Sequence, residues 1–418
     1  MRSVEEILAN PGFDLEKVRG DFDYLKLEGD PIIYLDNGAT TQRPRQVIER
    51  VDAFYREENA NPLRGTHRLA LASTLAYEKA RAKVAKFINA PLPREIIFTR
   101  NTTESLNLLA YSYGMDVLKE GDEILISRME HHSNSVPWQF VAKRTGAKLV
   151  YAEIDEDYQL DMEDFTSKLN DKTKIVSITG ASNVLSSEPD VKEIARLSHE
   201  VGAIVICDAA QLVPHHVVDV QDLGVDFLVF SGHKMLAPFG IGVLWGKSEL
   251  LEEMRPFLFG GEMIEYVYDD SSTFAELPYK FEAGTQNVGG AVGLAAAIDY
   301  INEIGMEHIS EYEKALAEYC AKRMFDSDIV KVYHPKTGNR GAAVAFNVCG
   351  VHPHDTSSIL DNEGIAVRAG HHCAQQLHRG LGVQSSCRAS FAFYNTKEEI
   401  DKLMVSLENV LKTMGYLS

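Results

Sequence analysis

"KIVSITGASNVLSSEPDVKEIARLSHEVGAIVICDAAQ" (residues 174–211) has the pattern of two buried strands joined by a helix. The runs 174–179 and 203–208 are short, rich in β-branched residues and bounded by glycine or polar residues, which is typical of strands buried on both faces. Between them, residues 190–201 repeat apolar side chains at helical spacing. A strand, a helix and a second strand in this order predict a crossover unit of a parallel sheet.

The same alternation extends in both directions along the chain. Helix-like segments at 135–145 and 161–170 separate further apolar runs with strand character. We therefore expect an α/β fold in which a mostly parallel sheet carries helices on both faces. In such sheets, ligands bind beyond the carboxyl ends of the strands. The further runs are "EIIFT" (95–99), "EILIS" (123–127), "KLVYAEI" (148–154) and "FLVFSG" (227–232).

The C-terminal quarter has a different pattern, which predicts a smaller α+β domain. Its last helix is the clearest, because Thr396 and Glu399 form a capping box before apolar residues at helical spacing. Residues 289–305 predict the helix that joins the two parts. The other elements expected here are strands near 330–335, 342–348 and 387–393 and a helix near 354–363.

The length of 418 residues is enough for two domains with sizeable cores. We predict an N-terminal segment over residues 1–20 that packs with the small domain. The large domain is expected to span residues 21–290, and the small C-terminal domain residues 291–418.

Composition limits the partners and the compartment. The chain has 42 basic and 61 acidic residues, and its net charge of −19 repels nucleic acid and anionic membranes. The first residues lack the apolar region of a signal peptide, and no run of 18 apolar residues occurs. Five cysteines are too few for a disulfide framework, so we expect a reducing, cytoplasmic location. From the charge and the lack of long apolar runs we expect neither membrane nor nucleic-acid partners. Cys207, Cys320, Cys349 and Cys387 are expected to be buried apolar residues.

"FLVFSGHK" (227–234) places Lys234 directly after a buried strand. A lone loop lysine is ordinarily a surface residue, but Asp208 and Gln211 follow the preceding strand. A lysine and a carboxylate at neighbouring strand ends are the pair that a pyridoxal phosphate site requires. The lysine forms the Schiff base, and the aspartate keeps the pyridine nitrogen protonated so that the ring accepts electrons.

A phosphate needs its own donors, and "FTRNTTESLNLLA" (98–110) runs from a strand into an amphipathic helix. Thr102 and Thr103 then lie at a helix N-terminus, where free N–H groups bind anions. An ordinary asparagine cap is the alternative. Ser231 and His233 add donors from the lysine loop. No dinucleotide-binding or P-loop motif follows a strand, which disfavours dinucleotides and nucleoside triphosphates.

Three further stretches lie where they could contact the same ligand. "SRMEHHSNSVPW" (127–138) follows a strand, and a histidine there could lie over a cofactor ring or be a solvated helix-start residue. "SITGASNVL" (177–185) brings Asn183 to the same sheet edge. "FEAGTQN" (281–287) is either a phosphate contact or ordinary turn chemistry.

"RAGHHCAQQL" (368–377) places Arg368, His371, His372 and Cys373 within six positions. The cysteine could be a metal ligand, a nucleophile or a buried filler. This stretch alone does not decide among them.

Taken together, nine stretches in order resemble the Suf-type (group II) cysteine desulfurases of the class V aminotransferase family. The resemblance runs from about residue 30 to the end, with compatible spacing. It implies the fold type I architecture of pyridoxal phosphate enzymes: a mostly parallel seven-stranded sheet in the large domain and a smaller α+β C-terminal domain. The stretches are "YLDNGATTQRP", "NTTESLN", "MEHHSNSVPWQ", "SNVL", "CDAAQ", "FSGHK", "FEAGTQN", "RAGHHCA" and "CRASFAFYNT".

The resemblance implies pyridoxal phosphate as the cofactor of the large domain. The implied ring contacts are Lys234 as Schiff-base lysine and proton shuttle, Asp208 at the pyridine nitrogen, Gln211 at the ring hydroxyl, His131 stacked on the ring, and Asn183. The implied phosphate contacts are Thr102, Thr103, Ser231 and His233, together with Thr285 of the other subunit, so the site requires a homodimer.

The implied reaction removes sulfur from L-cysteine and leaves L-alanine, with Cys373, Lys234 and His131 as catalytic residues. Cys373 accepts the sulfur as a persulfide, which a small acceptor protein of the Suf system takes for iron–sulfur cluster assembly. Arg388 and Asn183 hold the substrate carboxylate, and Arg368 lines the same pocket. Only a minority of free thiols ionise at neutral pH, so Arg368, His371 and His372 would raise the thiolate share if they lie close.

Alternatives stay open at this point. L-selenocysteine lyase activity, or another class V lyase activity, would use the same pocket, whereas aminotransferases and kynureninase-like hydrolases do not need Cys373. A thiol or metal protein built on His371, His372 and Cys373 is disfavoured, because adjacent residues rarely direct three side chains at one ion. We therefore predict no metal.

The chain departs from the family pattern at six positions around these motifs. Glycine often marks backbone with positive φ or close approach, so the changes could alter loops, rate or substrate preference. The departures are Leu63 for histidine, Ala209 and Ala237 for glycine, Ser186 and Ser187 in place of Gly-Thr, and Phe239 for a small polar residue.

Overall fold

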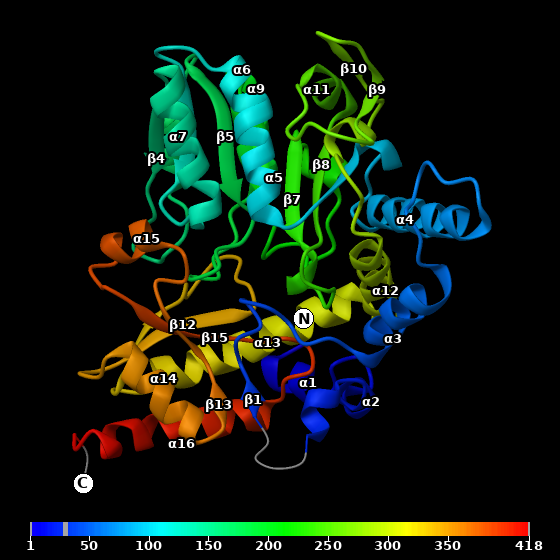
Figure 1. Ribbon diagram of the computed structural model, residues 1–418. Coiled ribbons are helices and arrows are strands. Elements are labelled where there is room, and N and C mark those ends of the chain that lie inside the picture. Colours follow the sequence, from blue (N-terminus) through cyan, green and yellow to red (C-terminus); the bar gives the residue numbers. More distant parts are fainter. Residues whose placement is uncertain (1, 28–31, 417–418) are drawn as a thin grey trace.

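A seven-stranded sheet forms the centre of the larger part of the chain (Figure 1). The computed structural model describes residues 2–27 and 32–416; Met1, residues 28–31 and residues 417–418, which fall within the three predicted domain ranges, lie outside the described residues. All six strands predicted for this part are present. In spatial order the strands are β2 (Ile96–Thr99), β8 (Gly242–Gly246), β7 (Phe227–Ser231), β6 (Ile204–Asp208), β5 (Thr173–Thr179), β3 (Glu123–Ser127) and β4 (Lys148–Ala152).

Strand β8 is the member of this sheet that the sequence did not predict. It pairs antiparallel with both β7 and β2, whereas β7, β6, β5, β3 and β4 run parallel to one another. Its first residue is Gly242, where a Cβ atom would lie only 2.5 Å from the Cα atom of Asn101. Glycine weakens the strand pattern in the sequence, but here it permits the close approach of another backbone segment.

Helices cover both faces of the sheet, as the alternation predicts (Figure 1). The predicted helices appear as α7 (Val136–Thr145), α8 (Met162–Lys168) and α9 (Val191–Glu200), and α8 and α9 begin at aspartate caps. The other helices of this part are α3 (Arg45–Ala53), α4 (Arg68–Phe87), α5 (Thr102–Leu109), α6 (Met115–Val117), α10 (Val220–Leu223) and α11 (Ser248–Glu253), with π-helical turns at Phe54–Glu58 and Ala110–Gly114 and 3₁₀ turns at Asp23–Lys26, Pro93–Glu95, His132–Asn134, Gly232–Lys234 and Tyr279–Phe281.

The smaller part is built on a four-stranded antiparallel sheet. The long helix α12 (Val288–Ile304) leads into it, and the predicted capping box of Thr396 and Glu399 begins α16 (Lys397–Thr413). Strand β14, which carries Arg368, was not predicted. The sheet order is β11 (Val330–Tyr333), β12 (Ala343–Val348), β15 (Ser386–Ser390) and β14 (Arg368–Gly370), with helices α13 (Met306–Phe325), α14 (Pro353–Asn362) and α15 (Gln375–Gly380).

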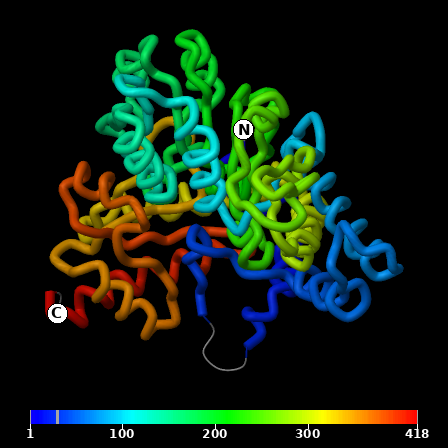
Figure 2. The backbone as a smooth tube through the Cα atoms, turned by 45° about the horizontal axis from the view of Figure 1, so that its top comes forward, coloured from blue at the N-terminus to red at the C-terminus, as the bar shows by residue number. Residues whose placement is uncertain are grey.

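The N-terminal segment lies beside the C-terminal part of the chain (Figure 2). Helix α1 (Val4–Ala9) packs against α13, and Arg19 of α2 (Leu15–Gly20) donates to Glu399 at 2.8 Å. The exact domain boundaries stay a prediction. The remaining short strands are β1 (Ile33–Tyr34), which pairs parallel with β13 (Ile365–Ala366), and the hairpin of β9 (Ile264–Val267) and β10 (Ser272–Phe274).

Strand β1 and the residues that follow it connect the two sheets next to the candidate site. After β1 the chain passes the end of β15, where Asp36 bridges to Ser390. The carboxyl ends of β5, β6 and β7 face this crossing segment and the smaller sheet. Polar side chains from both parts of the molecule therefore meet at one edge of the large sheet.

A buried ion pair ties α4 to the segment before α12. Arg81 is 1% exposed, and its guanidinium donates to both carboxylate oxygens of Glu282 at 2.7 and 2.8 Å. Glu282 also accepts from the Tyr77 hydroxyl at 2.8 Å and from the Phe98 N–H at 2.7 Å. Removal of one partner of such a pair leaves an uncompensated buried charge.

We predict that Glu282→Gln lowers the free energy of unfolding by about 3–5 kcal/mol, the cost typical of breaking a buried ion pair. Urea denaturation followed by circular dichroism measures the change. Glu200→Gln, which removes an exposed partner of Arg196, is the control and should leave the midpoint unchanged. A loss no larger than that of the control would contradict the prediction.

Candidate active site

A cavity of about 400 Å³ opens at the carboxyl ends of the parallel strands, between the two parts of the chain. This volume lies within the range of small-molecule sites. Every predicted site residue except Thr285 lines it. These residues are Thr102, Thr103, His131, Asn183, Asp208, Gln211, Ser231, His233, Lys234, Arg368, Cys373 and Arg388.

Lys234 and Asp208 meet in this cavity because they follow adjacent parallel strands. Asp208 ends β6 and is 4% exposed, and one of its carboxylate oxygens accepts from the Ala210 N–H at 3.1 Å. Burial raises the pKa of Asp208, while the nearby Lys234 lowers it. Burial lowers the pKa of Lys234 to about 8, although the attraction of Asp208 raises it. A lysine with such a pKa has a much larger amine fraction near neutral pH than an ordinary lysine, as a nucleophile or proton carrier requires.

His131 enters the cavity as a neutral ring. Its Nδ1 accepts the Ser133 N–H at 3.1 Å, so the proton of the neutral ring is on Nε2. Burial lowers the pKa of His131 to about 3, and the charge of Lys234 acts in the same direction. A neutral imidazole can stack on an aromatic cofactor ring without bringing a second positive charge into the pocket.

The end of the cavity at the start of α5 is suited to an anion. Helix α5 begins here, and the hydroxyls of Thr102 and Ser231 share a hydrogen bond of 2.7 Å. The Thr103 hydroxyl lies 2.6 Å from that of Ser133, a residue that the sequence analysis did not select. The buried Nδ1 of His233 has no partner among the described residues. A helix N-terminus, several hydroxyls and an unpaired ring nitrogen together fit a phosphate group.

Gln211 and Asn183 reach the cavity with side chains already engaged by the protein. The Gln211 amide donates to the Gly38 carbonyl at 2.8 Å, and the Asn183 amide donates to the His372 carbonyl at 2.6 Å. Asn183 therefore connects the large sheet to the loop that carries the cysteine.

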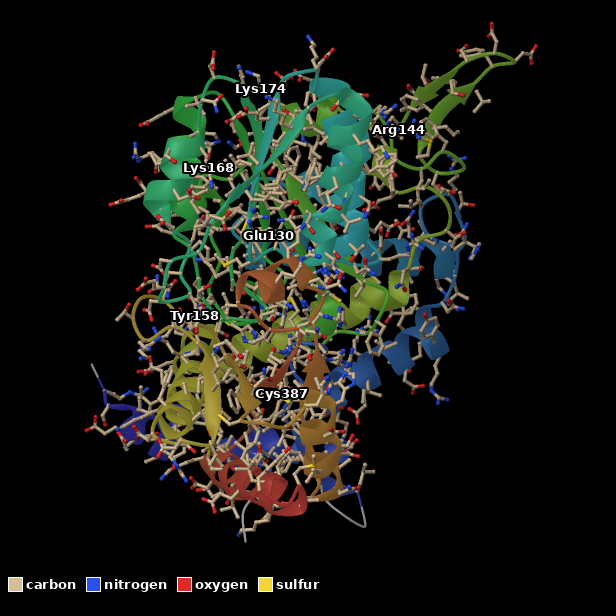
Figure 3. All side chains as sticks on the ribbon, turned by 90° about the vertical axis from the view of Figure 1, so that its left-hand side faces the viewer. Glu130, Arg144, Tyr158, Lys168, Lys174 and Cys387 are labelled. Atoms are coloured by element: carbon tan, nitrogen blue, oxygen red, sulfur yellow. The ribbon has the colours of Figure 1, made fainter. Side chains whose placement is uncertain are left out.

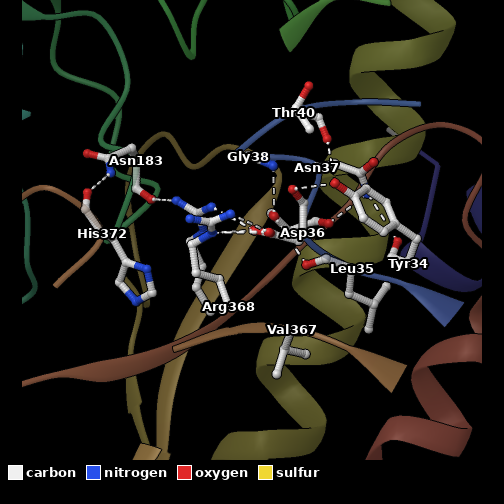
Figure 4. A network of polar contacts seen from close by, with 12 residues as sticks. Tyr34, Leu35, Asp36, Asn37, Gly38, Thr40, Asn183, Val367, Arg368 and His372 are labelled. Carbon is white, nitrogen blue, oxygen red and sulfur yellow. Dashed lines mark hydrogen bonds and ion pairs between the residues drawn. The ribbon is translucent and has the colours of Figure 1, made fainter. Parts of the chain in front are cut away.

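The two predicted substrate arginines converge on Asp36, which the sequence analysis quoted but did not select (Figure 4). Arg388 is 2% exposed, and it donates to the Asn183 carbonyl at 2.8 Å and to Asp36 at 3.2 Å. Arg368 contacts both carboxylate oxygens of Asp36 at 2.9–3.0 Å. The signal for Asp36 was present in "YLDNGATTQRP", but its partners lie more than 300 residues away in the sequence.

Cys373 lies in a loop between β14 and α15 that is held against the large sheet. Its thiol is free and the residue is exposed, and both it and His372 have a positive φ, of 55° and 50°. Its carbonyl accepts the His132 N–H at 2.7 Å, and the Gln375 N–H donates to the His132 ring at 3.1 Å. Because residues in this backbone region are strained, the surrounding contacts must fix the loop.

The histidine beside the thiol does not supply the charge that was expected. The His372 ring points toward Ser386, with its Nε2 3.0 Å from the Ser386 carbonyl, and burial lowers the pKa of His372 to about 2. His372 is therefore neutral. The positive charges coupled to Cys373 belong to Lys234, Arg368 and Arg388.

The other cysteines mostly match the prediction of buried apolar residues. Cys207, Cys320 and Cys387 are buried, whereas Cys349 is exposed, so the prediction for Cys349 was wrong. The residue directly follows the last position of β12, where the chain turns at Gly350 with a φ of 79°. A turn at the end of an apolar strand leaves the side chain outside the core.

Two of the departures from the family pattern lie at left-handed backbone. Ser186 has a φ of 60° and Leu63 a φ of 75°, a region that costs non-glycine residues energy. Ser186 is supported there, because its hydroxyl accepts the Ala343 N–H at 2.9 Å. Ala209 and Ala237 are buried without positive φ, and Phe239 is 68% exposed with Arg43 over its ring at 4.5 Å.

The buried carboxyl of Glu130, which is labelled in Figure 3, was not selected from the sequence. It accepts from the Ser127 hydroxyl at 2.5 Å, from the Asn134 amide at 2.6 Å and from the Thr179 N–H at 3.0 Å. Burial raises the pKa of Glu130 to about 7 despite these donors. The contacts join the ends of β3 and β5 and fix the turn from which His131 projects.

The Aminotransferase class-V family profile matches residues 33–403. The chain belongs to the class V aminotransferase family. It is 50% identical over 399 residues to a probable cysteine desulfurase of Synechocystis sp., across 94% of this chain and 95% of that protein. It is 46% identical over 410 residues to a cysteine desulfurase of Haloferax volcanii, across 94% and 96%.

Solved structures lead to the same group. The apo structure of a cysteine desulfurase from Thermococcus onnurineus superimposes with a TM-score of 0.91 at 41% identity, across 95% of this chain and 98% of that chain. The cysteine desulfurase CsdA of Escherichia coli, in an S-sulfonic acid form, gives a TM-score of 0.89 at 38% identity, across 96% and 99%.

These findings confirm the fold type I architecture, the family and the prediction of a cysteine desulfurase. Class V members of this kind are pyridoxal phosphate enzymes, and the cavity has the lysine, carboxylate and anion-binding end that this cofactor needs. Cysteine is the substrate of cysteine desulfurases. Within residues 2–27 and 32–416, no helix is long and apolar enough to cross a membrane.

We predict that the amine of Lys234 titrates near pH 8, because burial lowers its pKa more than Asp208 raises it. An ordinary lysine titrates near 10.4. Competitive acetylation of cofactor-free protein with acetic anhydride, read by mass spectrometry of the peptide that contains Lys234, gives the midpoint.

Asp208→Asn is the matched variant for this measurement. It should move the midpoint of Lys234 to lower pH, because it removes the negative charge that stabilises the ammonium form. A midpoint near 10.4, or one that Asp208→Asn leaves in place, would be inconsistent with the desolvated pair described above.

Proposed function

We propose that this chain is a Suf-type cysteine desulfurase that transfers the sulfur of L-cysteine to Cys373 and releases L-alanine. One observation carries the proposal: the exposed thiol of Cys373 lines the same cavity as Lys234 and Asp208. An aminotransferase has no need of a thiol at that place. The names of the relatives support the same reaction.

The residues of the cavity fit the cofactor in two groups. Asp208 is suited to the pyridine nitrogen, Gln211 to the ring hydroxyl and His131 to the face of the ring. Thr102, Thr103, Ser231 and His233 are suited to the phosphate, because they gather at the start of α5. Bound pyridoxal phosphate supplies an electron sink for the bonds at the α-carbon of the amino acid.

The substrate carboxylate is assigned to Arg388 and Asn183, with Arg368 beside them. Lys234, in its amine form, takes the α-proton at Nζ and returns a proton to the carbon skeleton. The Cys373 thiolate attacks the sulfur of the substrate. A sulfur–sulfur bond forms, the carbon–sulfur bond breaks, and its electron pair with a proton yields the methyl group of L-alanine. The products are one persulfide and one alanine for each cysteine.

The thiolate of a cysteine is its nucleophilic form, and three positively charged groups lie near Cys373. Lys234, Arg368 and Arg388 each interact with the Cys373 charge. Because Cys373 is exposed, a small acceptor protein of the Suf system can reach the persulfide from solution. We also propose a cytoplasmic location, since a catalytic free thiol needs reducing surroundings. L-selenocysteine stays an alternative substrate for the same pocket.

A homodimer is part of the proposal because Thr285 lies outside the cavity of its own chain. It is exposed, and the neighbouring Asn287 donates to the Gly240 carbonyl at 2.7 Å, which holds the 281–287 loop beside the segment of Phe239. The Phe239 ring is 68% exposed. An apolar side chain and a free hydroxyl on one face are what a subunit interface that completes the phosphate site would need.

We predict that Cys373→Ser abolishes the formation of alanine and sulfide from L-cysteine with a reductant, a loss of about 1,000-fold or more for removal of a nucleophile. Chromatography of alanine and a sulfide assay measure both products. Cys349→Ser is the matched control, since Cys349 is also exposed but distant from the cavity lining, and it should keep full turnover. Turnover that survives Cys373→Ser, or wild-type protein with bound cofactor that yields neither product, would refute the proposed function.

We predict that Thr285→Val weakens retention of pyridoxal phosphate by about tenfold, because a hydrogen bond to a charged phosphate is lost. Equilibrium dialysis with absorbance detection measures the cofactor, and sedimentation measures the mass of the dimer. Thr413→Val, at the exposed end of α16, should change neither. A monomeric holoenzyme, or unchanged retention in Thr285→Val, would count against a shared site.

A further inference from the structure

Asp36 lies between Arg368 and Arg388, two arginines that line the cavity (Figure 4). We propose that Asp36 is a specificity-determining residue: it engages Arg368 and leaves Arg388 as the single carboxylate receptor. The pocket then selects amino acids with a single carboxylate. This inference rests on the proposed function for the assignment of Arg388 to the substrate.

The contact between Arg368 and Asp36 uses the edge of the guanidinium that would otherwise bind a ligand. Nε and Nη2 of Arg368 donate to the two oxygens of Asp36 at 2.9–3.0 Å, a two-point contact. Such a fork is the geometry with which arginine binds carboxylates most strongly. Arg368 lines the cavity and is about half exposed, yet its binding edge is already satisfied by the protein.

Arg388, in contrast to Arg368, keeps a hydrogen-bond donor that the described residues do not satisfy. It is almost fully buried, its Nη1 donates to the Asn183 carbonyl, and its Nη2 makes one longer contact of 3.2 Å with Asp36. Its buried Nε has no hydrogen-bond partner among the described residues. A buried donor without a partner is costly, so this nitrogen is suited to a ligand oxygen that arrives in the cavity.

Arg368, Arg388 and Asp36 form one charged cluster beside the cavity. Two guanidinium groups and one carboxylate leave a single positive charge. One substrate carboxylate balances it. A second carboxylate on the substrate would find the binding edge of Arg368 already occupied by Asp36.

The backbone holds Asp36 in this place. Asp36 bridges to Ser390 of β15, and the Gly38 N–H donates to the Ser390 hydroxyl at 2.8 Å. A Cβ atom at Gly38 would lie 3.1 Å from the guanidinium carbon of Arg388, so glycine permits the close approach of this turn to the arginine. These backbone contacts hold the Asp36 carboxylate against the two arginines that line the cavity.

Calorimetric titration of the holoenzyme with propionate and with succinate tests the inference. Neither acid has an amine, so neither reacts with the cofactor, and they differ by one carboxylate. We expect the wild-type protein to favour propionate. Asp36→Asn should raise the affinity for succinate relative to propionate by about tenfold, because the freed fork of Arg368 gains a charged partner.

Three further variants separate specificity from a merely structural role. In the double variant Asp36→Asn/Arg368→Gln the gain for succinate should disappear, and Asp36→Glu should restore the preference for propionate. Asp401→Asn, which removes a surface carboxylate beside Arg323, should leave the ratio of affinities at the wild-type value. An Asp36→Asn protein that is folded, by its melting temperature, and shows an unchanged ratio would overturn the inference.

Arg368→Gln keeps the test decisive if Asp36→Asn does not fold. The inference expects the wild-type ratio of the two affinities in Arg368→Gln, because Arg368 is not available to ligands. A selective loss of succinate binding in Arg368→Gln would overturn it. Turnover of L-cysteine is measured separately: its absence would refute the proposed function, whereas the ratio of affinities reports on Asp36 alone.

Discussion

The desolvated pair of Lys234 and Asp208 is the interaction on which the site depends. Each follows a buried strand, β7 and β6, and the parallel pairing of these strands brings both groups to one edge of the sheet. Burial lowers the pKa of Lys234 to about 8 and raises that of Asp208, and the attraction between the two groups opposes both shifts. The family chemistry of pyridoxal phosphate requires this combination of a reactive amine and a fixed carboxylate.

The smaller part of the chain supplies the Cys373 thiol and the two arginines. A few contacts hold these groups in place relative to Lys234 and Asp208. The cysteine loop is fixed to the large sheet by His132 and Asn183, and β1 carries Asp36 to the end of β15. The charge around Cys373 therefore comes from Lys234, Arg368 and Arg388 rather than from the adjacent histidine. These contacts bring Cys373 of the smaller part and Lys234 of the larger part to the same cavity.

Much of the fold and the site could be predicted because the signals are local. Six strands and the capping box of α16 were visible as short patterns, and the twelve cavity residues came from such patterns or from the family resemblance. Glu130, Ser133 and Asp36 were missed, since each acts through partners that only the folded chain brings close. Strand β8 was missed because Gly242, a poor strand former, is there to let Asn101 approach. Cys349 was predicted as buried from its apolar context, but it follows a strand at a turn.

The sequence by itself determined the crossover units, the family and the residue types of the chemistry, because periodicity and motif order are properties of neighbouring residues. The tertiary structure decided which of those residues share a cavity, which are neutral and which are already engaged. His372 faces Ser386, and Arg368 is bound to Asp36, although both lie within six residues of Cys373. The physical reason is that burial, charge and hydrogen-bond partners are set by segments far apart in the chain, which meet only when the two sheets pack.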